Sequence, residues 1–321
     1  MRKKISYIGL SFLVTVAITL LFASCLRLRT NDTAVLDKLA ARDVGGGVCY
    51  FTISDRTMRY AYAGADTLPL LVLLHGAPGS SSGLLDFLTD SLLLSHVKII
   101  TPDRAGYGYS GFGRSEVSLE IQAKYIAEII QRQAFGQPVI VMGNSYGGSV
   151  AARLAMDYPE LLDGLLLIST AVAPGEEKIY GISRPLHFLG LKWLIPSVLR
   201  VANDEKMYHF RELEKMSAYW DNIKVPVWML HGEADQLIYP GNALYAKKRL
   251  KGRPFKLITL PEQDHYIIWN KPELVKETIM NALVELQIAP PEILADASLD
   301  WSEAVNSISA DETPIRNDFS H

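Results

Sequence analysis

The feature that most constrains the fold is a series of short apolar runs that alternate with segments of helical pattern. The runs are apolar on both alternating positions, which is typical of strands buried on both faces of a parallel sheet. They are Leu68–Leu74, Val97–Thr101, Val139–Met142, Leu165–Ile168, Val225–Leu230 and Phe255–Leu260. The helical patterns are Leu119–Arg132, Ser145–Asp157, Gly241–Leu250 and Pro272–Leu286. This alternation predicts an α/β protein with a doubly wound, mostly parallel sheet.

An insertion interrupts the alternation after the fourth apolar run. Between Ala171 and Asp221 the chain uses about 50 residues where a connection is usually much shorter. Within it, Leu186–Leu199 is apolar, helical in pattern and includes Phe188 and Trp193. We therefore expect a helical lid at about residues 171–221, with an apolar face that covers the edge of the sheet.

The segments at either end set the expected domain limits. A hairpin of Val48–Ile53 and Arg56–Tyr62 precedes the parallel strands, so the α/β domain is predicted to cover residues 48–286 after a connector over residues 26–47. Residues 287–321 carry seven acidic residues against one basic residue. This composition predicts an acidic, weakly structured tail.

The first 25 residues have the composition of a targeting or membrane segment. Basic residues at positions 2–4 precede Ile5–Ala23, a stretch of 19 residues without charge. The stretch fits an uncleaved membrane anchor. Phe22–Cys25 also resembles the cleavage box of a bacterial lipoprotein, in which Cys25 would carry the lipid. Both interpretations tether the protein to a bacterial membrane and place its body outside the cytoplasm.

The charge and the cysteine content exclude several classes of function. The chain has 32 Lys and Arg against 35 Asp and Glu, a net charge of −3, and it lacks a basic block long enough for nucleic acid. Two cysteines cannot make a disulfide framework, and no Cys/His cluster has the spacing of a zinc site. We expect no nucleic-acid partner, no metal and no cofactor.

The clearest chemical signal is the pentapeptide Gly143–Gly147, which reads Gly-Asn-Ser-Tyr-Gly, follows a buried strand and opens a helix. A G-x-S-x-G sequence in this context makes a sharp turn that lifts its serine above the sheet. The N-terminus of the following helix favours developing negative charge. Ser145 is therefore a candidate nucleophile. The competing interpretation is a serine that only caps a helix.

A serine nucleophile needs a base, and the base needs an acid that orients it. Of the seven histidines, His265 follows the strand Phe255–Leu260 in a polar loop from which it could reach the carboxyl edge of the sheet. Asp235 comes just after the strand Val225–Leu230 and is the candidate acid, with Glu233 as the alternative.

With these pieces in place, the chain resembles lidded α/β-hydrolase fold proteins that use a serine nucleophile. The matching pieces are His75–Gly79, Asp103–Ser110, Gly143–Gly148, His231–Asp235 and Asp264-His265, and the nucleophile, acid and base occur in the chain order of that family. The resemblance implies oxyanion donors at the backbone N–H groups of Ala77 and Tyr146. It also separates the chain from haloalkane dehalogenases and epoxide hydrolases, which carry Asp as the nucleophile.

We therefore expect a serine hydrolase that cleaves a small or medium carboxylic ester through an acyl-enzyme. The apolar lid favours an apolar acyl or alcohol part. An aminopeptidase or amidase of the proline iminopeptidase type is the first alternative, because His75–Gly79 also occurs in those relatives, which usually carry Trp where Tyr146 stands. Hydrolysis of a carbon–carbon bond and a non-catalytic binding module of the same fold are the others.

Overall fold

The computed structural model describes residues 11, 14, 28–188, 195–290 and 292. Nearly all of Ile5–Ala23, Cys25 and nearly all of the acidic tail fall outside these residues, and so do the predictions for them. Among the residues that are described, none of the helices combines the length and the apolar character needed to cross a membrane.

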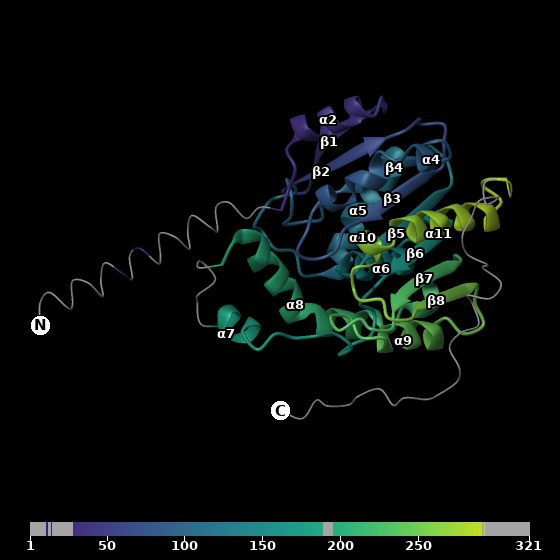
Figure 1. The fold of residues 1–321 in the computed structure, drawn as a ribbon. Coiled ribbons are helices and arrows are strands. Elements are labelled where there is room, and N and C mark those ends of the chain that lie inside the picture. The colour runs from purple at the N-terminus through teal and green to yellow at the C-terminus, as the bar shows by residue number, and fades with distance from the viewer. Residues whose placement is uncertain (1–10, 12–13, 15–27, 189–194, 291, 293–321) are drawn as a thin grey trace, which may run out of the picture.

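One sheet of eight strands forms the centre of the described chain (Figure 1), with the spatial order β1-β2-β4-β3-β5-β6-β7-β8. The strands are β1 (Gly46–Ile53), β2 (Arg56–Ala63), β3 (Leu70–Leu74), β4 (Lys98–Pro102), β5 (Val139–Asn144), β6 (Gly164–Ile168), β7 (Val227–Gly232) and β8 (Phe255–Leu260). The hairpin of β1 and β2 is antiparallel and β2 joins β4 in the same sense, while all the other neighbours are parallel. The predicted α/β fold with a mostly parallel sheet is confirmed.

Two strands begin later than the apolar pattern predicted. The predicted starts were Leu68 and Val225, whereas β3 begins at Leu70 and β7 at Val227. Each strand starts directly after a proline, which has no N–H to donate to a neighbouring strand.

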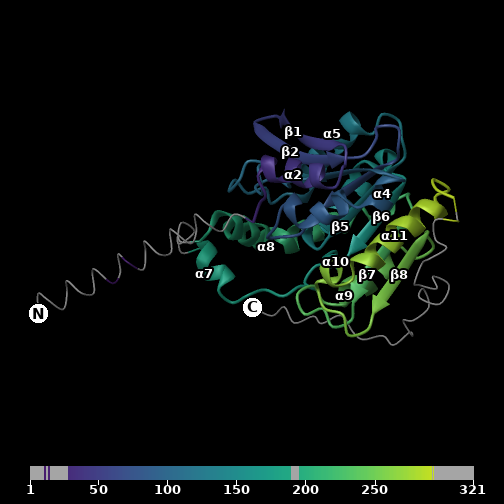
Figure 2. The same cartoon turned by 45° about the horizontal axis from the view of Figure 1, so that its top comes forward.

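Helices cover both faces of the sheet (Figure 2), and alternate residues of each strand belong to two different cores. Leu70, Val72 and Leu74 pack toward the first helical layer, and Leu71 and Leu73 toward the second. The first layer contains α5 (Leu119–Gln133), α6 (Tyr146–Asp157) and α9 (Gly241–Arg249); the second contains α3 (Leu85–Leu88), α4 (Ser91–Leu94), α10 (Ile267–Asn270) and α11 (Pro272–Glu285). Burial on both faces explains why the strand sequences are continuously apolar.

The prediction of a connector over residues 26–47 was wrong. This segment contains helix α2 (Asp32–Ala41), and β1 already begins at Gly46. Asn31 caps the helix by accepting a hydrogen bond from the N–H of Ala34 at 2.8 Å. Val35 and Leu39 are buried in the second core, so the helix is part of the domain. Only two of its ten residues are buried, and this apolar stripe is too narrow to stand out as periodicity.

The insertion between β6 and β7 forms two helices, α7 (Ser183–Phe188) and α8 (Ser197–Met216). The expected helical stretch Leu186–Leu199 is therefore divided: α7 ends at Phe188, residues 189–194 are not described, and Pro196 precedes α8. The Phe188 side chain is exposed rather than turned toward the sheet. Helix α8 supplies the lid wall of the site through side chains that recur every three or four residues.

The packing of α2 predicts a difference between two leucines of that helix. Leu39→Ala should lower the free energy of unfolding by roughly 2–3 kcal/mol, because it opens a cavity in the core. Leu36→Ala is the matched control, since Leu36 is exposed, and it should change this free energy by less than about 0.5 kcal/mol. Guanidinium unfolding of the full chain followed by circular dichroism measures both. Equal, small effects would mean that α2 does not belong to the folded domain.

Candidate active site

Ser145 stands at the turn between β5 and α6 with a backbone conformation that few residues adopt. Its φ is +54° and its ψ is −123°, a combination that costs a non-glycine residue about 1–3 kcal/mol and persists only where the surrounding structure holds it. The N–H of Ser145 donates to the carbonyl of Ile168 in β6 at 2.9 Å, which fixes the turn to the neighbouring strand. The turn directs the serine side chain into the cavity described below.

Two glycines permit the close packing that holds this turn. A Cβ on Gly147 would overlap the carbonyl oxygens of Leu74 and His75, and a Cβ on Gly148 would overlap the side chain of Thr170. Helix α6 can therefore start directly against the end of β3. Gly147, the last residue of the pentapeptide, and Gly148, which follows it, are both required by this packing.

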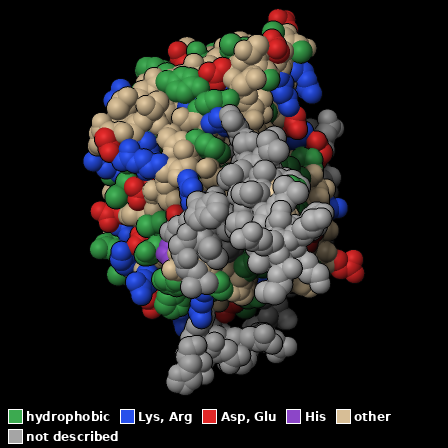
Figure 3. All heavy atoms as spheres, turned by 90° about the vertical axis from the view of Figure 1, so that its left-hand side faces the viewer, with side chains coloured by type: hydrophobic (Ala, Val, Ile, Leu, Met, Phe, Trp, Pro, Cys, Tyr) green, Lys and Arg blue, Asp and Glu red, His purple; other side chains and the backbone are tan. Residues whose placement is uncertain are grey.

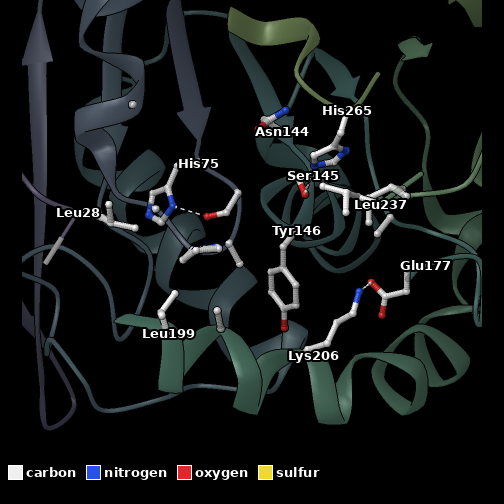
Figure 4. Close-up of a pocket in the computed structure, with 18 of the residues that line it drawn as sticks. Leu28, His75, Asn144, Ser145, Tyr146, Glu177, Leu199, Lys206, Leu237 and His265 are labelled. Atoms are coloured by element: carbon white, nitrogen blue, oxygen red, sulfur yellow. Dashed lines mark hydrogen bonds and ion pairs between the residues drawn. The ribbon is translucent and has the colours of Figure 1, made fainter. Parts of the chain in front are cut away.

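The structure brings Ser145, His265 and Asp235 together at the carboxyl edge of the sheet. Ser145 Oγ lies 3.0 Å from Nε2 of His265, and Nδ1 of His265 lies 2.7 Å from Oδ2 of Asp235. Figure 4 shows the imidazole of His265 beside Ser145. The serine comes from the β5–α6 turn, the aspartate from the loop after β7 and the histidine from the loop between β8 and α10. This arrangement can pass a proton from the hydroxyl to the imidazole.

Asp235, rather than Glu233, is the carboxylate beside the histidine. Asp235 is buried, and its Oδ1 accepts hydrogen bonds from the N–H groups of Leu237 and Ile238 at 2.9 and 2.8 Å. These bonds leave Oδ2 directed at His265. Glu233 is exposed.

Ala77 and Tyr146, whose N–H groups the family resemblance implies as oxyanion donors, line the same cavity as Ser145. Tyr146 is the first residue of α6, so its N–H has no acceptor within the helix. Ala77 follows β3 and lines the same cavity as Ser145. The preceding Gly76 is so close that a Cβ there would lie 3.0 Å from the Cβ of Ser145. Their role as donors stays a prediction.

A buried arginine connects the loop after β3 with the lid. Arg104 donates from its backbone N–H to Nε2 of His75 at 2.9 Å and from Nε to the carbonyl of His75 at 2.8 Å. Its Nη1 pairs with Glu205 of α8 at 2.7 Å, and Tyr107 donates to the other oxygen of Glu205 at 2.6 Å. Burial, together with the Arg104 cation, holds the pKa of His75 well below its usual value, so His75 acts as a neutral structural residue. The sequence offered no signal for the role of Glu205, which depends on the lid's placement.

A second group of serine, histidine and carboxylate lies nearby, and the sequence analysis did not anticipate it. Nε2 of His209 in α8 lies 3.1 Å from Oγ of Ser149 in α6, and its Nδ1 lies 3.0 Å from Glu177. The Ser149 hydroxyl donates to the carbonyl of Ala171, which can only accept. Its proton is thus committed to that carbonyl, and His209 donates to Ser149 instead of taking its proton. Ser149 is also fully buried, so this group fastens the lid to α6.

The site opens into a cavity of about 760 Å³, a size that suits a small-molecule ligand. Its wall is mixed. Leu28, Leu84, Leu199, Leu237, Ile238 and Trp269 supply apolar surface. The lid insertion adds the charged residues Glu177, Lys178 and Lys206, and Nζ of Lys206 lies 2.9 Å from Glu177. The lid therefore presents charged as well as apolar side chains to the cavity. Across the described ranges, no three His, Cys, Asp or Glu side chains are grouped so that they could hold a metal ion.

Known proteins resemble this chain in sequence. Residues 69–193 match the family model of the alpha/beta hydrolase fold. An epoxide hydrolase of Neurospora crassa is 31% identical over 141 residues, which cover 40% of this chain and 41% of that protein. A lysophosphatidylserine lipase of Rattus norvegicus is 28% identical over 240 residues, which cover 68% of this chain and 56% of that protein. The chain spans about half the length of these curated relatives.

Solved structures show the same architecture. The crystal structure of a bacterial membrane phospholipase A superposes with a TM-score of 0.62 and 18% sequence identity, over 89% of this chain and 100% of that chain. At this identity the likeness shows the fold alone.

The charged group on the lid predicts a pH dependence of stability. Burial would raise the pKa of Glu177, but His209 and Lys206 bring it down from 4.5 to about 2. A depressed pKa stabilises the fold above pH 4.5, and this contribution is lost as the pH falls from 4.5 toward 2. Glu177→Gln should therefore lower Tm at pH 7, and the difference from the wild type should shrink below pH 4.5. A series of thermal melts tests this; a constant difference down to the lowest pH measured would contradict it.

Proposed function

We propose that this chain, a member of the α/β-hydrolase fold family, is a serine hydrolase that cleaves a carboxylic ester through an acyl-enzyme. The observation that carries the proposal is the continuous line of hydrogen bonds from Ser145 through His265 to Asp235 at the wall of a ligand-sized cavity. A base within hydrogen-bond reach of the nucleophile, itself oriented by a buried acid, is the arrangement that activates a serine.

The reaction uses each of these groups in turn. Ser145 Oγ attacks the ester carbonyl while Nε2 of His265 takes the hydroxyl proton, and Asp235 holds the imidazole by Nδ1 and stabilises the imidazolium. The backbone N–H groups of Ala77 and Tyr146 bind the developing oxyanion. His265 then gives its proton to the leaving alcohol. In the second half, the same imidazole activates a water that hydrolyses the acyl-enzyme.

An ester is favoured over the aminopeptidase alternative by the charge of the cavity wall. An aminopeptidase must bind the free ammonium group of its substrate, which calls for an unpaired carboxylate. Among the described residues that line the cavity, the acidic one is Glu177, and Lys206 and His209 already pair with it. Turnover of prolyl anilides with a higher kcat/KM than p-nitrophenyl esters would overturn this choice.

We also propose that the first 25 residues tether the protein to a bacterial membrane and leave the hydrolase body outside the cytoplasm. The support is the sequence: Ile5–Ala23 is uncharged and follows three basic residues, and Cys25 ends a segment like a lipoprotein cleavage box. Intact-mass analysis of membrane-extracted protein distinguishes a chain that begins at a lipid-bearing Cys25 from one that keeps Ile5–Ala23. Recovery of the uncleaved chain in the cytoplasmic fraction would exclude both.

The two serine–histidine groups predict opposite results for two serine variants. Ser145→Ala should abolish labelling by a fluorophosphonate probe and lower ester hydrolysis on the order of 10³-fold or more. Ser149→Ala is the matched control in the same helix region, and it should keep the labelling because its hydroxyl is buried and not activated. Circular dichroism checks that both are folded. Labelling of Ser145→Ala as strong as that of the wild type would show that another residue is the nucleophile, and failure of the wild type to react would favour a non-catalytic binding module.

The assignment of the acid predicts a second contrast. Asp235→Asn should lower kcat for a p-nitrophenyl ester by roughly 10²–10⁴-fold, because an amide no longer favours the imidazole tautomer that accepts the serine proton. Glu233→Gln should change kcat by less than about twofold, since that side chain is exposed. Steady-state kinetics with one ester substrate measures both. A larger loss with Glu233→Gln would contradict the assignment.

A further inference from the structure

The chain enters the folded domain at the edge of the catalytic cavity. Leu28 lines this cavity and is exposed on one side (Figure 4). Its carbonyl accepts a hydrogen bond from the hydroxyl of Ser80 at 2.7 Å, and the N–H of Thr30 donates to Oγ of Ser82 at 2.6 Å. Ser80 and Ser82 line the cavity as well. Residues 28–30 are thus bound to the wall of the site.

Arg29 strengthens this attachment. Its Nη1 donates to the carbonyl of Gly108 at 2.7 Å. Its guanidinium lies over the rings of Tyr109 and Phe112, 4.2 and 4.6 Å from their centroids. Five contacts within three residues hold the tether's end in one place, so the cavity opening stays close to any membrane that contains the preceding segment.

Exposed apolar side chains gather around the same opening. Leu28, Tyr180, Tyr266 and Trp269 line the cavity and still leave between 42 and 52% of their surface exposed. The chain beyond Tyr180 continues to α7, where Ile182 and Phe188 are 65 and 72% exposed. We call these six residues the rim: four line the cavity, and two belong to the adjoining lid segment, Ile182 just before α7 and Phe188 at its end. Single exposed apolar residues are common on proteins, but a group around one opening marks an interaction site.

The surroundings of the rim suit a lipid surface. Lys178 and Arg184, which flank Tyr180 and Ile182 in the chain, are exposed. Figure 3 shows the face on the left of Figure 1, where, outside the grey atoms, hydrophobic side chains lie beside both basic and acidic side chains. Tyr and Trp favour the boundary between lipid and water, and Lys and Arg are attracted to anionic headgroups.

We propose that the cavity opening faces the membrane, that the rim docks on lipid, and that the substrate is the ester of a lipid that enters from the bilayer. This inference rests on the proposed hydrolase and tether. The tether is short compared with the domain, which supports this proposal. The five residues from Ala23 to Leu28 span at most about 17 Å when extended. A domain of this size has a radius of gyration of about 18 Å and is therefore more than 40 Å across. The tether cannot reach around such a body, so the rim lies nearest the bilayer.

Fluorescence quenching in vesicles tests the docking without any need for activity. The full chain is inserted through its own N-terminal segment into vesicles of phosphatidylcholine and phosphatidylglycerol that contain brominated phosphatidylcholine. The fluorescence of Trp269 is obtained as the difference in tryptophan emission between the wild type and Trp269→Phe. We expect the bromine to quench this emission. The control is Phe135→Trp in the Trp269→Phe background, because Phe135 is exposed between the end of α5 and the start of β5, at the opposite edge of the sheet. The fluorescence of the tryptophan introduced at position 135 should not be quenched by the brominated lipid.

Each result of the quenching experiment decides the question. Selective quenching of Trp269 supports docking of the rim on lipid. Equal quenching of both positions means unspecific adsorption and overturns the proposal. Absence of quenching at Trp269 also overturns it and leaves the rim to a protein partner. Docking of a wild-type chain that hydrolyses no ester would refute the proposed function alone. Hydrolysis by the wild type that is lost in Ser145→Ala, without quenching at Trp269, would refute the docking alone.

A comparison of two substrates tests the source of the ester. Ile182→Ser combined with Phe188→Ser should lower the ratio of hydrolysis of a vesicle-embedded phospholipid ester to that of p-nitrophenyl acetate by roughly 10-fold, because the variant removes apolar surface that would be buried in lipid. Phe135→Ser is the matched control and should leave this ratio unchanged. An unchanged ratio in the rim variant would contradict entry of the substrate from the bilayer.

Discussion

Helix α6 begins so close to the ends of β3 and β5 that no side chain fits between them, and the geometry of the site depends on this approach. Gly147 and Gly148 have no side chains, so α6 can approach Leu74 and Thr170 closely enough to make this contact. The short turn places Ser145 at a positive φ, a conformation that a non-glycine residue keeps only where the surrounding structure holds it. In return, the serine hydroxyl reaches the cavity and the first N–H of α6 stays free of helix hydrogen bonds.

The lid is joined to this centre by buried polar contacts as well as by buried apolar side chains of α8 such as Val201 and Leu213. Glu205 pairs with Arg104, and His209 binds Ser149, so two positions one turn apart on α8 are fixed to two different parts of the site. Breaking a buried pair on one side leaves a charge without compensation, which costs several kcal/mol. Helix α8 therefore forms a fixed wall of the cavity, and the exposed residues of α7 lie at its outer end.

The two groups of serine, histidine and carboxylate show why residue identity does not determine reactivity. Both have hydrogen bonds of about 3 Å between serine and imidazole. Ser149 is buried and its hydroxyl donates a hydrogen bond to a carbonyl, whereas Ser145 faces a cavity. Access and hydrogen-bond direction distinguish the proposed nucleophile, Ser145, from Ser149, whose contact joins the lid to α6. The attachment of residues 28–30 to the same cavity links this chemistry to the place where the chain enters the domain.

The sequence by itself determined the sheet, because strands buried on both faces must be continuously apolar, and it determined that Ser145 follows a strand and opens a helix. It could not show that residues 32–41 form a packed helix, since two buried residues make too weak a pattern. Only the tertiary structure decided that Asp235 and not Glu233 meets His265, and that Glu205 meets Arg104. Asp235 and Glu233 are both carboxylates in one loop, so residue type does not distinguish them. The direction of each side chain is set by distant segments that pack against the loop.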